Sequence, residues 1–326
     1  MPRMVAVAAL ACAMLLGLSP IALAETYPNR TITLVAPFAA GGSSDLLARV
    51  TAQGMSQRLG QTVIVENRDG AGGTLGTGVV AHSSPDGYTL VLAGVGPLVF
   101  GVGIYGSHLP YDVHKDLAPI GLVGTTPTII VAGRATTAKS LADLVAMAKA
   151  HPGTVTYGSA GVGGALHLAA ELLQHMAGIK LVHVPYRGSA PALTDVLGGQ
   201  VQFGFLDAGS VIGQRSNPDL RIIAVAGKER MPLWPDAPTA VEQGYPGLVV
   251  PVWYGVLAPK KTPPEVIDIL EKATQDTAND PAFQKLLIQS GFVPSPGDRS
   301  AFAALIDSEL ARWLPIMKDA NITPPR

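Results

Sequence analysis

The stretch that decides the fold is TLVAPFAAGGSSDLLARV, residues 33–50. It passes from an apolar segment typical of a buried strand, through two glycines and two serines, into a helical pattern. Gly41 and Gly42 leave backbone N–H groups bare at the electropositive start of that helix, which is how proteins cradle phosphates and carboxylates. One of the two serines is expected to cap the helix, and Asp45 in its first turn suits the helix dipole. Because ligands of open α/β sheets bind beyond the carboxyl ends of the strands, the stretch predicts an anion-binding loop.

Strand and helix patterns alternate along most of the chain. Strands are predicted over 31–38, 62–67, 88–94, 128–133, 155–161, 181–186, 201–207 and 221–227. Helices are predicted over 44–60, 140–153, 165–178, 190–200, 263–280, 281–291 and 300–320. This alternation is typical of parallel sheets flanked by helices, and a chain of about 300 residues usually exceeds one core. The sequence therefore predicts an α/β protein of two domains.

The N-terminus has the composition of a secretory signal peptide. Residues 1–24 combine an early arginine, a long apolar run and a small-x-small ending, so we expect export to the periplasm and cleavage after Ala24. A membrane anchor is the alternative, but a spanning helix needs about 20 apolar residues and Pro20 interrupts this run. The only cysteine, Cys12, lies too early for a lipoprotein anchor. The mature chain is thus expected to have neither disulfides nor thiol catalysis.

The charge balance argues against several classes of partner. Without residues 1–24 the chain keeps 22 basic and 24 acidic residues, and they form no basic cluster. This argues against binding to nucleic acid or to an anionic membrane surface. No second apolar run is long enough to span a bilayer, so no stable membrane insertion is expected.

A second loop has the same construction as the first. VTYGSAGVGGALHLAAELL, residues 155–173, runs from a strand through Tyr157, Ser159 and several glycines into an amphipathic helix. Two strand-end loops of matching chemistry, one in each half of the chain, can face each other across a cleft. They predict a small anionic ligand held between two domains.

Nucleotide and metal sites have weaker support. GAGGTLG, residues 70–76, follows a strand and resembles a dinucleotide-binding fingerprint, but its last glycine comes one residue late. His167, His175 and His183 are spaced by eight residues, which gives no shared ligand face on a helix. We therefore predict no metal and no cofactor.

Hydrolysis stays open as an alternative. GSAG, residues 158–161, is close to the nucleophile elbow of hydrolases, but Tyr157 replaces the first glycine of that motif. Ser159 could still join a triad assembled from distant residues. No catalytic residue is predicted, and we do not expect an enzyme.

Eight segments, taken in order, carry a family resemblance. They are PFAAGGSSDLLAR, VIVENRDGAGGTLGT, SPDGYTLVLAG, LPYDVHKDLAPIGLVG, YGSAGVGGALHLAAELL, HVPYRGSAPALTDVLGGQV, PDAPTAVEQGYPG and WYGVLAPKKTPPEVID. From Tyr27 to about Lys318, the chain resembles the Bug-type (TctC-type) solute-binding receptors of tripartite tricarboxylate transporters. The resemblance implies a monomeric two-domain type II periplasmic binding fold, a Venus flytrap in which each domain is a mainly parallel sheet flanked by helices. It also implies that a carboxylate is clamped between the domains and delivered to a membrane permease.

The resemblance also implies domain limits and ligand-binding residues. Domain one would comprise residues 25–123 and 246–326, and domain two residues 124–245. The ligand-binding residues carried over from the family's loops are Phe38, Ala39, Ala40, Gly41, Gly42, Ser43, Ser44, Asp45, Gly94, Tyr157, Ser159, Ala160, Gly161, His167, Arg187 and Asp207. Arg187 either clamps a carboxylate or lies on the surface, since the family usually has lysine there and binds the anion through backbone N–H groups and water.

Departures from the family pattern bear on the ligand. Leu206 takes the place where an aspartate usually follows the strand, Gly94 begins a loop that usually offers Ser or Thr with Asn, and Ala160 replaces a common serine. Each change removes hydrogen-bonding side chains from the expected cleft. We therefore predict a ligand less polar than citrate or aspartate, such as an aromatic or short aliphatic carboxylate. A sensory or adaptor receptor that uses the same cleft is the alternative to transport.

Overall fold

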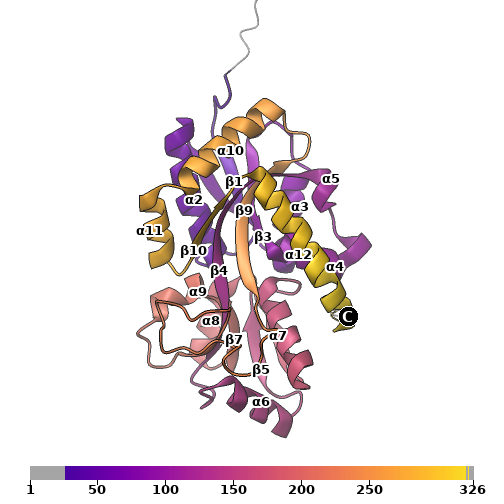
Figure 1. The fold of residues 1–326 in the computed structure, drawn as a ribbon, viewed down its shortest axis with the longest axis vertical. Helices are drawn as coiled ribbons and strands as arrows, with labels where there is room; N and C mark the ends of the chain where they lie inside the picture. Colours follow the sequence, from indigo (N-terminus) through magenta and orange to yellow (C-terminus); the bar gives the residue numbers. More distant parts are fainter. Residues whose placement is uncertain (1–25, 321, 323–326) are drawn as a thin grey trace, which may run out of the picture.

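The computed structural model describes residues 26–320 and 322, which form two lobes stacked along the long axis of the molecule (Figure 1). The first lobe, at the top of the view, carries both ends of the described chain's sequence, and the second lobe is built from the middle. The predicted signal peptide and Cys12 lie outside the described residues. Within them, no helix is long and apolar enough to cross a membrane.

The sheet of the first lobe has the order β2-β1-β3-β9-β4, with β10 also paired to β4. Its strands are β1 (Ile32–Ala36), β2 (Val63–Asn67), β3 (Thr89–Gly94), β4 (Leu117–Ala132), β9 (Pro251–Pro259) and β10 (Val293–Gly297). Its longer helices are α2 (Ser43–Leu59), α3 (Thr74–Ala81), α10 (Pro264–Ala278), α11 (Pro281–Gln289) and α12 (Arg299–Asp319). Short helical turns are η1 (Ala71–Gly73), η2 (Gly96–Phe100), α4 (Gly101–Tyr105), η3 (Gly106–His108) and α5 (Val113–Asp116). The N-termini of α2 and η2 follow β1 and β3, so both elements begin at the edge that faces the second lobe.

The second lobe continues the sheet from the far end of β4. Its strands are β5 (Thr156–Ser159), β6 (Val182–Pro185), β7 (Phe203–Asp207) and β8 (Arg221–Ala226), in the order β4-β7-β5-β6 with β8 also on β4. Its helices are α6 (Leu141–Ala150), α7 (Ala165–Ala177), α8 (Ser189–Gly198), α9 (Ala208–Val211) and the turn η4 (Ile212–Gln214). The loops after β5 and β7 therefore point toward the first lobe.

The α/β class with two lobes is confirmed, but the sheets are mixed rather than mainly parallel. Strands joined through helices are parallel, as β1 is to β2 and β3, and β5 is to β6 and β7. Strands β4, β8, β9 and β10 pair antiparallel to their neighbours. No strand–helix–strand crossover links β9 to β3 or to β4, and without one a neighbouring strand is free to run antiparallel.

The strand β4 is much longer than predicted. The sequence pattern predicts a strand only over residues 128–133, because Pro119, Gly121 and Pro127 interrupt the apolar pattern before it. In the structure β4 pairs with β9 as far as Pro127 and with β7 from Thr128 onward. One continuous strand thus belongs to both lobes.

The chain returns to the first lobe just before β9. The Val250 N–H donates to the Ala226 carbonyl at 3.1 Å, and Thr128 Oγ1 donates to the Val250 carbonyl at 2.8 Å. These bonds hold together the two segments that connect the lobes, one within β4 near Thr128 and one at Val250. The predicted domain limits, after residue 123 and before residue 246, fall a few residues ahead of these segments, and the exact division stays a prediction.

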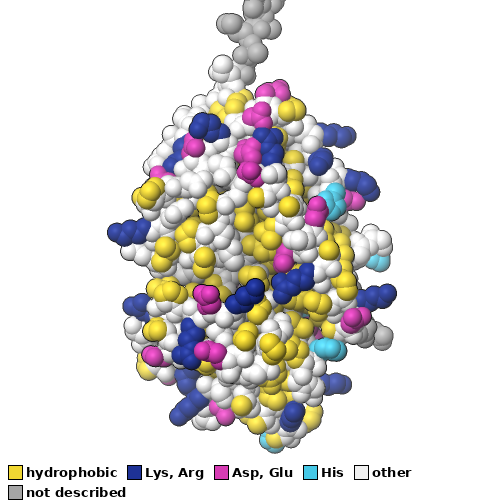
Figure 2. Space-filling model, viewed as in Figure 1, with side chains coloured by type: hydrophobic (Ala, Val, Ile, Leu, Met, Phe, Trp, Pro, Cys, Tyr) yellow, Lys and Arg dark blue, Asp and Glu magenta, His cyan; other side chains and the backbone are white. Residues whose placement is uncertain are grey.

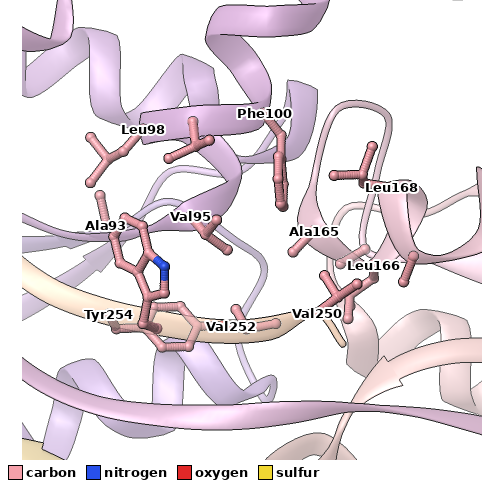
Figure 3. Packing of buried hydrophobic residues seen from close by; sticks show 14 of the residues in the cluster. Ala93, Val95, Leu98, Phe100, Ala165, Leu166, Leu168, Val250, Val252 and Tyr254 are labelled. Atoms are coloured by element: carbon pink, nitrogen blue, oxygen red, sulfur yellow. The ribbon is translucent and has the colours of Figure 1, made fainter. Parts of the chain in front are cut away.

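The apolar core runs through both lobes. Figure 3 shows residues of β3 and η2 beside residues from the start of α7 and from β9. The labelled members are Ala93, Val95, Leu98, Phe100, Ala165, Leu166, Leu168, Val250, Val252 and Tyr254. Most are fully buried, so the edge of the core reaches the contact between the lobes.

Candidate ligand-binding cleft

A small cavity of about 30 Å³ lies where the two lobes meet. The first lobe lines it with Phe38, Gly42, Ser43, Ser44, Gly94, Gly96, Pro97, Val252 and Tyr254. The second lobe lines it with Ala160, Gly164, Ala165, Leu166, Ser189 and Asp207. This volume holds one or two water molecules, far less than the roughly 300–1,000 Å³ of a typical small-molecule pocket. The lobes must separate before a larger ligand can enter.

The first-lobe wall is the loop between β1 and α2. Gly42 caps α2 in an extended conformation without a side-chain bond, so the prediction of a serine cap was wrong. Ser43 and Ser44 are instead the first two helical residues and line the cavity. The Ser44 Oγ is buried and has no hydrogen-bond partner among the described residues. A buried hydroxyl of this kind is costly unless something binds it.

Asp45 stabilises this loop through hydrogen bonds on the side away from the cavity. Its carboxylate accepts the Gly41 N–H at 3.0 Å, the Asn67 amide at 3.0 Å and the Arg49 Nε–H at 3.1 Å. Burial alone would raise the pKa of Asp45, but these hydrogen bonds outweigh it and the pKa lies below its usual value. The carboxylate therefore stays charged, and Asp45 does not line the cavity.

The second-lobe wall is the loop between β5 and α7. Gly164 caps α7, and Ala165 and Leu166 begin the helix. These three residues and Ala160 line the cavity, so this wall offers backbone and apolar surface. Ser159 is fully buried behind it, where its Oγ shares a 2.7 Å hydrogen bond with His183 Nε2.

A stacked column of rings supports the second-lobe wall. His183 lies between Tyr157 and His167, with ring centroids 4.8 and 4.3 Å apart and interplanar angles of 14° and 15°. Tyr157 Oη donates to Glu171 at 3.1 Å, and the Gly163 N–H donates to His167 Nδ1 at 3.3 Å. Burial lowers the pKa of His167, and burial together with the neighbouring His167 lowers the pKa of His183 to about 3. Both rings are therefore neutral at pH 7.

Asp207 is the charged side chain that lines the cavity. It ends β7, caps α9 and is only 5% exposed. Its Oδ1 accepts the Ser210 N–H at 2.9 Å and the Ser210 hydroxyl at 2.6 Å, and its Oδ2 accepts the Ser189 hydroxyl at 2.6 Å. The Ser43 hydroxyl of the other lobe also donates to Oδ1. Asp207 thus bonds to both lobes.

Glycine contacts bring the two lobes together beside the cavity. A Cβ on Gly72 would lie 2.5 Å from the Val162 carbonyl oxygen and 2.7 Å from the Gly164 nitrogen. Nearby, the Ala39 N–H donates to the Arg187 carbonyl at 2.9 Å. Within the glycine-rich segment 70–76, which resembles a dinucleotide fingerprint, Gly72 therefore contacts the backbone of the second lobe.

The structure places the predicted ligand-binding residues in two groups. Those that line the cavity are Phe38, Gly42, Ser43, Ser44, Gly94, Ala160 and Asp207. Those that do not are Ala39, Ala40, Gly41, Asp45, Tyr157, Ser159, Gly161, His167 and Arg187. Arg187 has an 82% exposed side chain whose Nε lies 3.8 Å from Asp69 Oδ2. The role of each in binding stays a prediction.

Sequence reasoning missed about half of the lining. The lining residues outside the predicted ligand-binding set are Gly96, Pro97, Gly164, Ala165, Leu166, Ser189, Val252 and Tyr254, although Ser189 belongs to a segment, residues 186–190, that the family resemblance places near the cleft. The helix start at Gly164 and Ala165 could have been found, since it lies inside the second glycine-rich loop. Val252 and Tyr254 carry no local signal, because only the pairing of β9 with β3 and β4 brings them to the cavity.

Among the described residues, three helices of ten or more residues begin at this cavity. The N-terminal residues of α2, α7 and α8 all line it, each after a glycine cap. First-turn N–H groups, such as those of Ser44, Ala165 and Leu166, have no acceptor within their own helix. None of the lining residues in the described chain is lysine or arginine. The arrangement therefore suits an anion held by helix N-termini and hydroxyls.

Comparison with known proteins agrees with this geometry. The model of the tripartite tricarboxylate transporter family receptor matches residues 47–322. The chain belongs to this receptor family. Protein BugT of Bordetella pertussis is 35% identical over 306 residues, which cover 94% of each chain.

Solved structures extend the agreement to the fold. The periplasmic binding protein BugD is 36% identical, with a TM-score of 0.86 over 91% of this chain and 99% of BugD. MatC from Rhodopseudomonas palustris, described with bound malate, is 30% identical, with a TM-score of 0.85 over 89% of this chain and 99% of MatC. The family consists of solute-binding receptors rather than enzymes, so neither the sensory nor the hydrolase alternative is favoured.

Proposed function

We propose that this receptor binds a small carboxylate between its lobes and delivers it to a tripartite tricarboxylate-type permease. The observation that carries the proposal is the convergence of the N-termini of α2 and α7 on one cavity. Such N-termini attract anions through free N–H groups and the helix dipole. The malate bound to MatC, a relative with the same fold, supports a carboxylate.

Binding would proceed in two steps. In the open receptor the carboxylate meets the hydroxyls and N–H groups of the first-lobe wall, which include Ser44 Oγ, a group with no hydrogen-bond partner among the described residues. Closure then adds the N–H groups of Ala165 and Leu166 from the second lobe. Because closure excludes water, each of these hydrogen bonds strengthens in the less polar surroundings.

The rest of the cavity favours an apolar ligand body. Phe38, Pro97, Leu166 and Val252 present apolar surface, and Gly94 and Ala160 have no side-chain hydrogen-bonding group. The polar groups gather around Ser43, Ser44 and Asp207. We therefore propose an aromatic or short aliphatic carboxylate rather than citrate or aspartate.

The cellular setting follows from the same family. We propose that the chain acts in the periplasm as a monomer without a cofactor, after cleavage behind Ala24. Acidic and basic side chains are interspersed over the face shown in Figure 2, with no basic patch on that face. This distribution suits a receptor that diffuses freely before it meets its permease.

A thermal-shift screen of residues 25–326 tests the proposal. A ligand at 100 times its Kd stabilises by about 2.7 kcal/mol, which moves the Tm by several degrees. We expect a shift with an apolar carboxylate and none with its neutral amide. An equal shift with acid and amide would refute the anion site. Tighter binding of citrate or aspartate than of every apolar acid would refute the ligand class.

A further inference from the structure

Within the described chain, the cavity-lining carboxylate of Asp207 makes one hydrogen bond across the two lobes. Asp207 belongs to the second lobe, yet it accepts the hydroxyl of Ser43 at the N-terminus of α2. Ser43 is itself held against the second lobe, since its N–H donates to Ser210 Oγ at 3.1 Å. A carboxylate of the protein therefore occupies the end of α2 at which a ligand carboxylate is expected to bind.

The bonding around Asp207 separates into two parts. Three donors, the N–H and hydroxyl of Ser210 and the hydroxyl of Ser189, come from its own lobe and persist when the lobes part. The bond from Ser43 exists only while the lobes are together. A ligand carboxylate beside Ser43 would compete for this hydroxyl and would repel the charge on Asp207.

We propose that Asp207 is an internal competitor of the ligand. In the ligand-free receptor its carboxylate binds Ser43 and holds the lobes together, and an incoming carboxylate must displace it. This inference rests on the proposed function, because it assumes that the ligand is an anion. Asp207 would then help to set the affinity for the ligand. The more of the ligand-free receptor is closed, the smaller the fraction that can bind, and the higher the measured Kd.

The test compares the wild type with Asp207→Asn. Removal of the charge weakens the closed ligand-free state, so the radius of gyration measured by X-ray scattering should rise without ligand. Calorimetric titration with benzoate, adipate and malate should show Kd tightened about tenfold for any probe that binds, if the closed state outweighs the open one by about ten to one.

Asp298→Asn is the matched control. Asp298 caps α12 by accepting the Ala301 N–H and the Ser300 hydroxyl, whereas Asp207 accepts the N–H and the hydroxyl of the single residue Ser210. Asp298 does not line the cavity. This variant should lose capping stability at an exposed helix start while its Kd and radius of gyration match the wild type.

Weaker binding by Asp207→Asn, or an unchanged radius of gyration, would overturn the inference and leave Asp207 as a ligand contact or a helix cap. If no probe binds any variant, the proposed function fails, and the radius of gyration still decides whether Asp207 holds the lobes. If Asp207→Asn does not fold, Ser43→Ala removes the same cross-lobe bond and should expand the ligand-free protein.

Discussion

The two walls of the cleft are built alike and used differently. Each is a glycine-rich turn from a parallel strand into a helix that begins after a glycine cap. The first-lobe wall brings the side chains of Ser43 and Ser44 to the cavity. The second-lobe wall brings backbone and the apolar side chains of Ala165 and Leu166, while Ser159 and His167 are bonded behind it.

The difference assigns separate tasks to the walls. Hydroxyl groups that recognise the ligand come mainly from the first lobe, so recognition can begin while the cleft is open. The second lobe supplies shape, N–H groups and a rigid backing of stacked rings. Matching sequence motifs therefore do not imply matching contacts with the ligand.

The largest effect is expected where the two walls touch. Gly72→Ala would place a Cβ against the backbone of residues 162–164, which has no flexible end to move aside. Closure would then be blocked, and we expect the affinity for the carboxylate to fall by on the order of a hundredfold, or about 2.7 kcal/mol. Calorimetric titration measures this loss.

Gly60→Ala is the control for that variant. Gly60 has φ +65°, close to the +62° of Gly72, and no atom lies within 4 Å of its added Cβ. Both alanines carry the same cost of about 1 kcal/mol for a left-handed backbone. Equal loss of affinity in both variants would show that the contact at Gly72 does not matter.

The next effect concerns the unpaired hydroxyl of the first wall. Ser44→Ala removes a ligand donor, so we expect binding about tenfold weaker, whereas the ligand-free Tm should stay constant or rise because a buried unsatisfied group is gone. Thr51→Val removes a second buried hydroxyl without a described partner, away from the cavity. It should raise the Tm and leave the affinity unchanged. Unchanged affinity in the Ser44→Ala variant would show that Ser44 does not bind the ligand.

The fold was largely predictable from sequence because its signals are local. The glycine that ends α2 at residue 60 and the alternation of strands and helices both follow from short-range patterns. The length of β4 and the mixed strand directions of the sheet could not be predicted from the sequence. Both depend on pairing between distant strands, which overrides the Pro and Gly signals within β4. Local chemistry predicts elements better than it predicts their partners.

The site was predictable to the extent that it lies on loops with a motif. Gly42, Ser43 and Ser44 were found because glycines next to a helix start suggest anion binding. Ser159 ends the strand before such a loop and His167 lies in the first turn of the helix after it, but both side chains are buried inside the lobe, and the motif alone does not reveal that direction. Tyr254 reaches the cavity only through the sheet order.

A smaller effect is expected from the rings behind the second wall. Unfolded histidine titrates near pH 6.5, whereas burial holds the pKa of His167 and His183 lower in the folded protein, at about 3 for His183. Below about pH 6.5 the unfolded chain takes up protons at both residues that the folded chain takes up only at lower pH, so stability falls as the pH falls, and for His183 this fall continues toward pH 3. Thermal melts between pH 7.5 and pH 5 should show this slope.

His183→Gln should flatten that slope. His175→Gln, on the exposed face of the same helix as His167, should keep it. A slope that is equal in both variants would show that the stacked rings do not couple stability to pH.

The smallest effect is expected at Arg187. Its side chain is 82% exposed and lies 3.8 Å from Asp69, outside the cavity. Exposed ion pairs contribute roughly 0–1 kcal/mol, so Arg187→Ala should change Kd by less than about threefold. A loss of a hundredfold would restore Arg187 as a carboxylate clamp.

The most direct test of the central claim is a crystal structure of residues 25–326 with the tightest carboxylate from the screen. The account predicts the carboxylate at the N-termini of α2 and α7, within hydrogen-bond distance of Ser44 Oγ and of first-turn N–H groups, without an arginine or lysine partner. A carboxylate paired with Arg187, or bound outside the cleft, would contradict it.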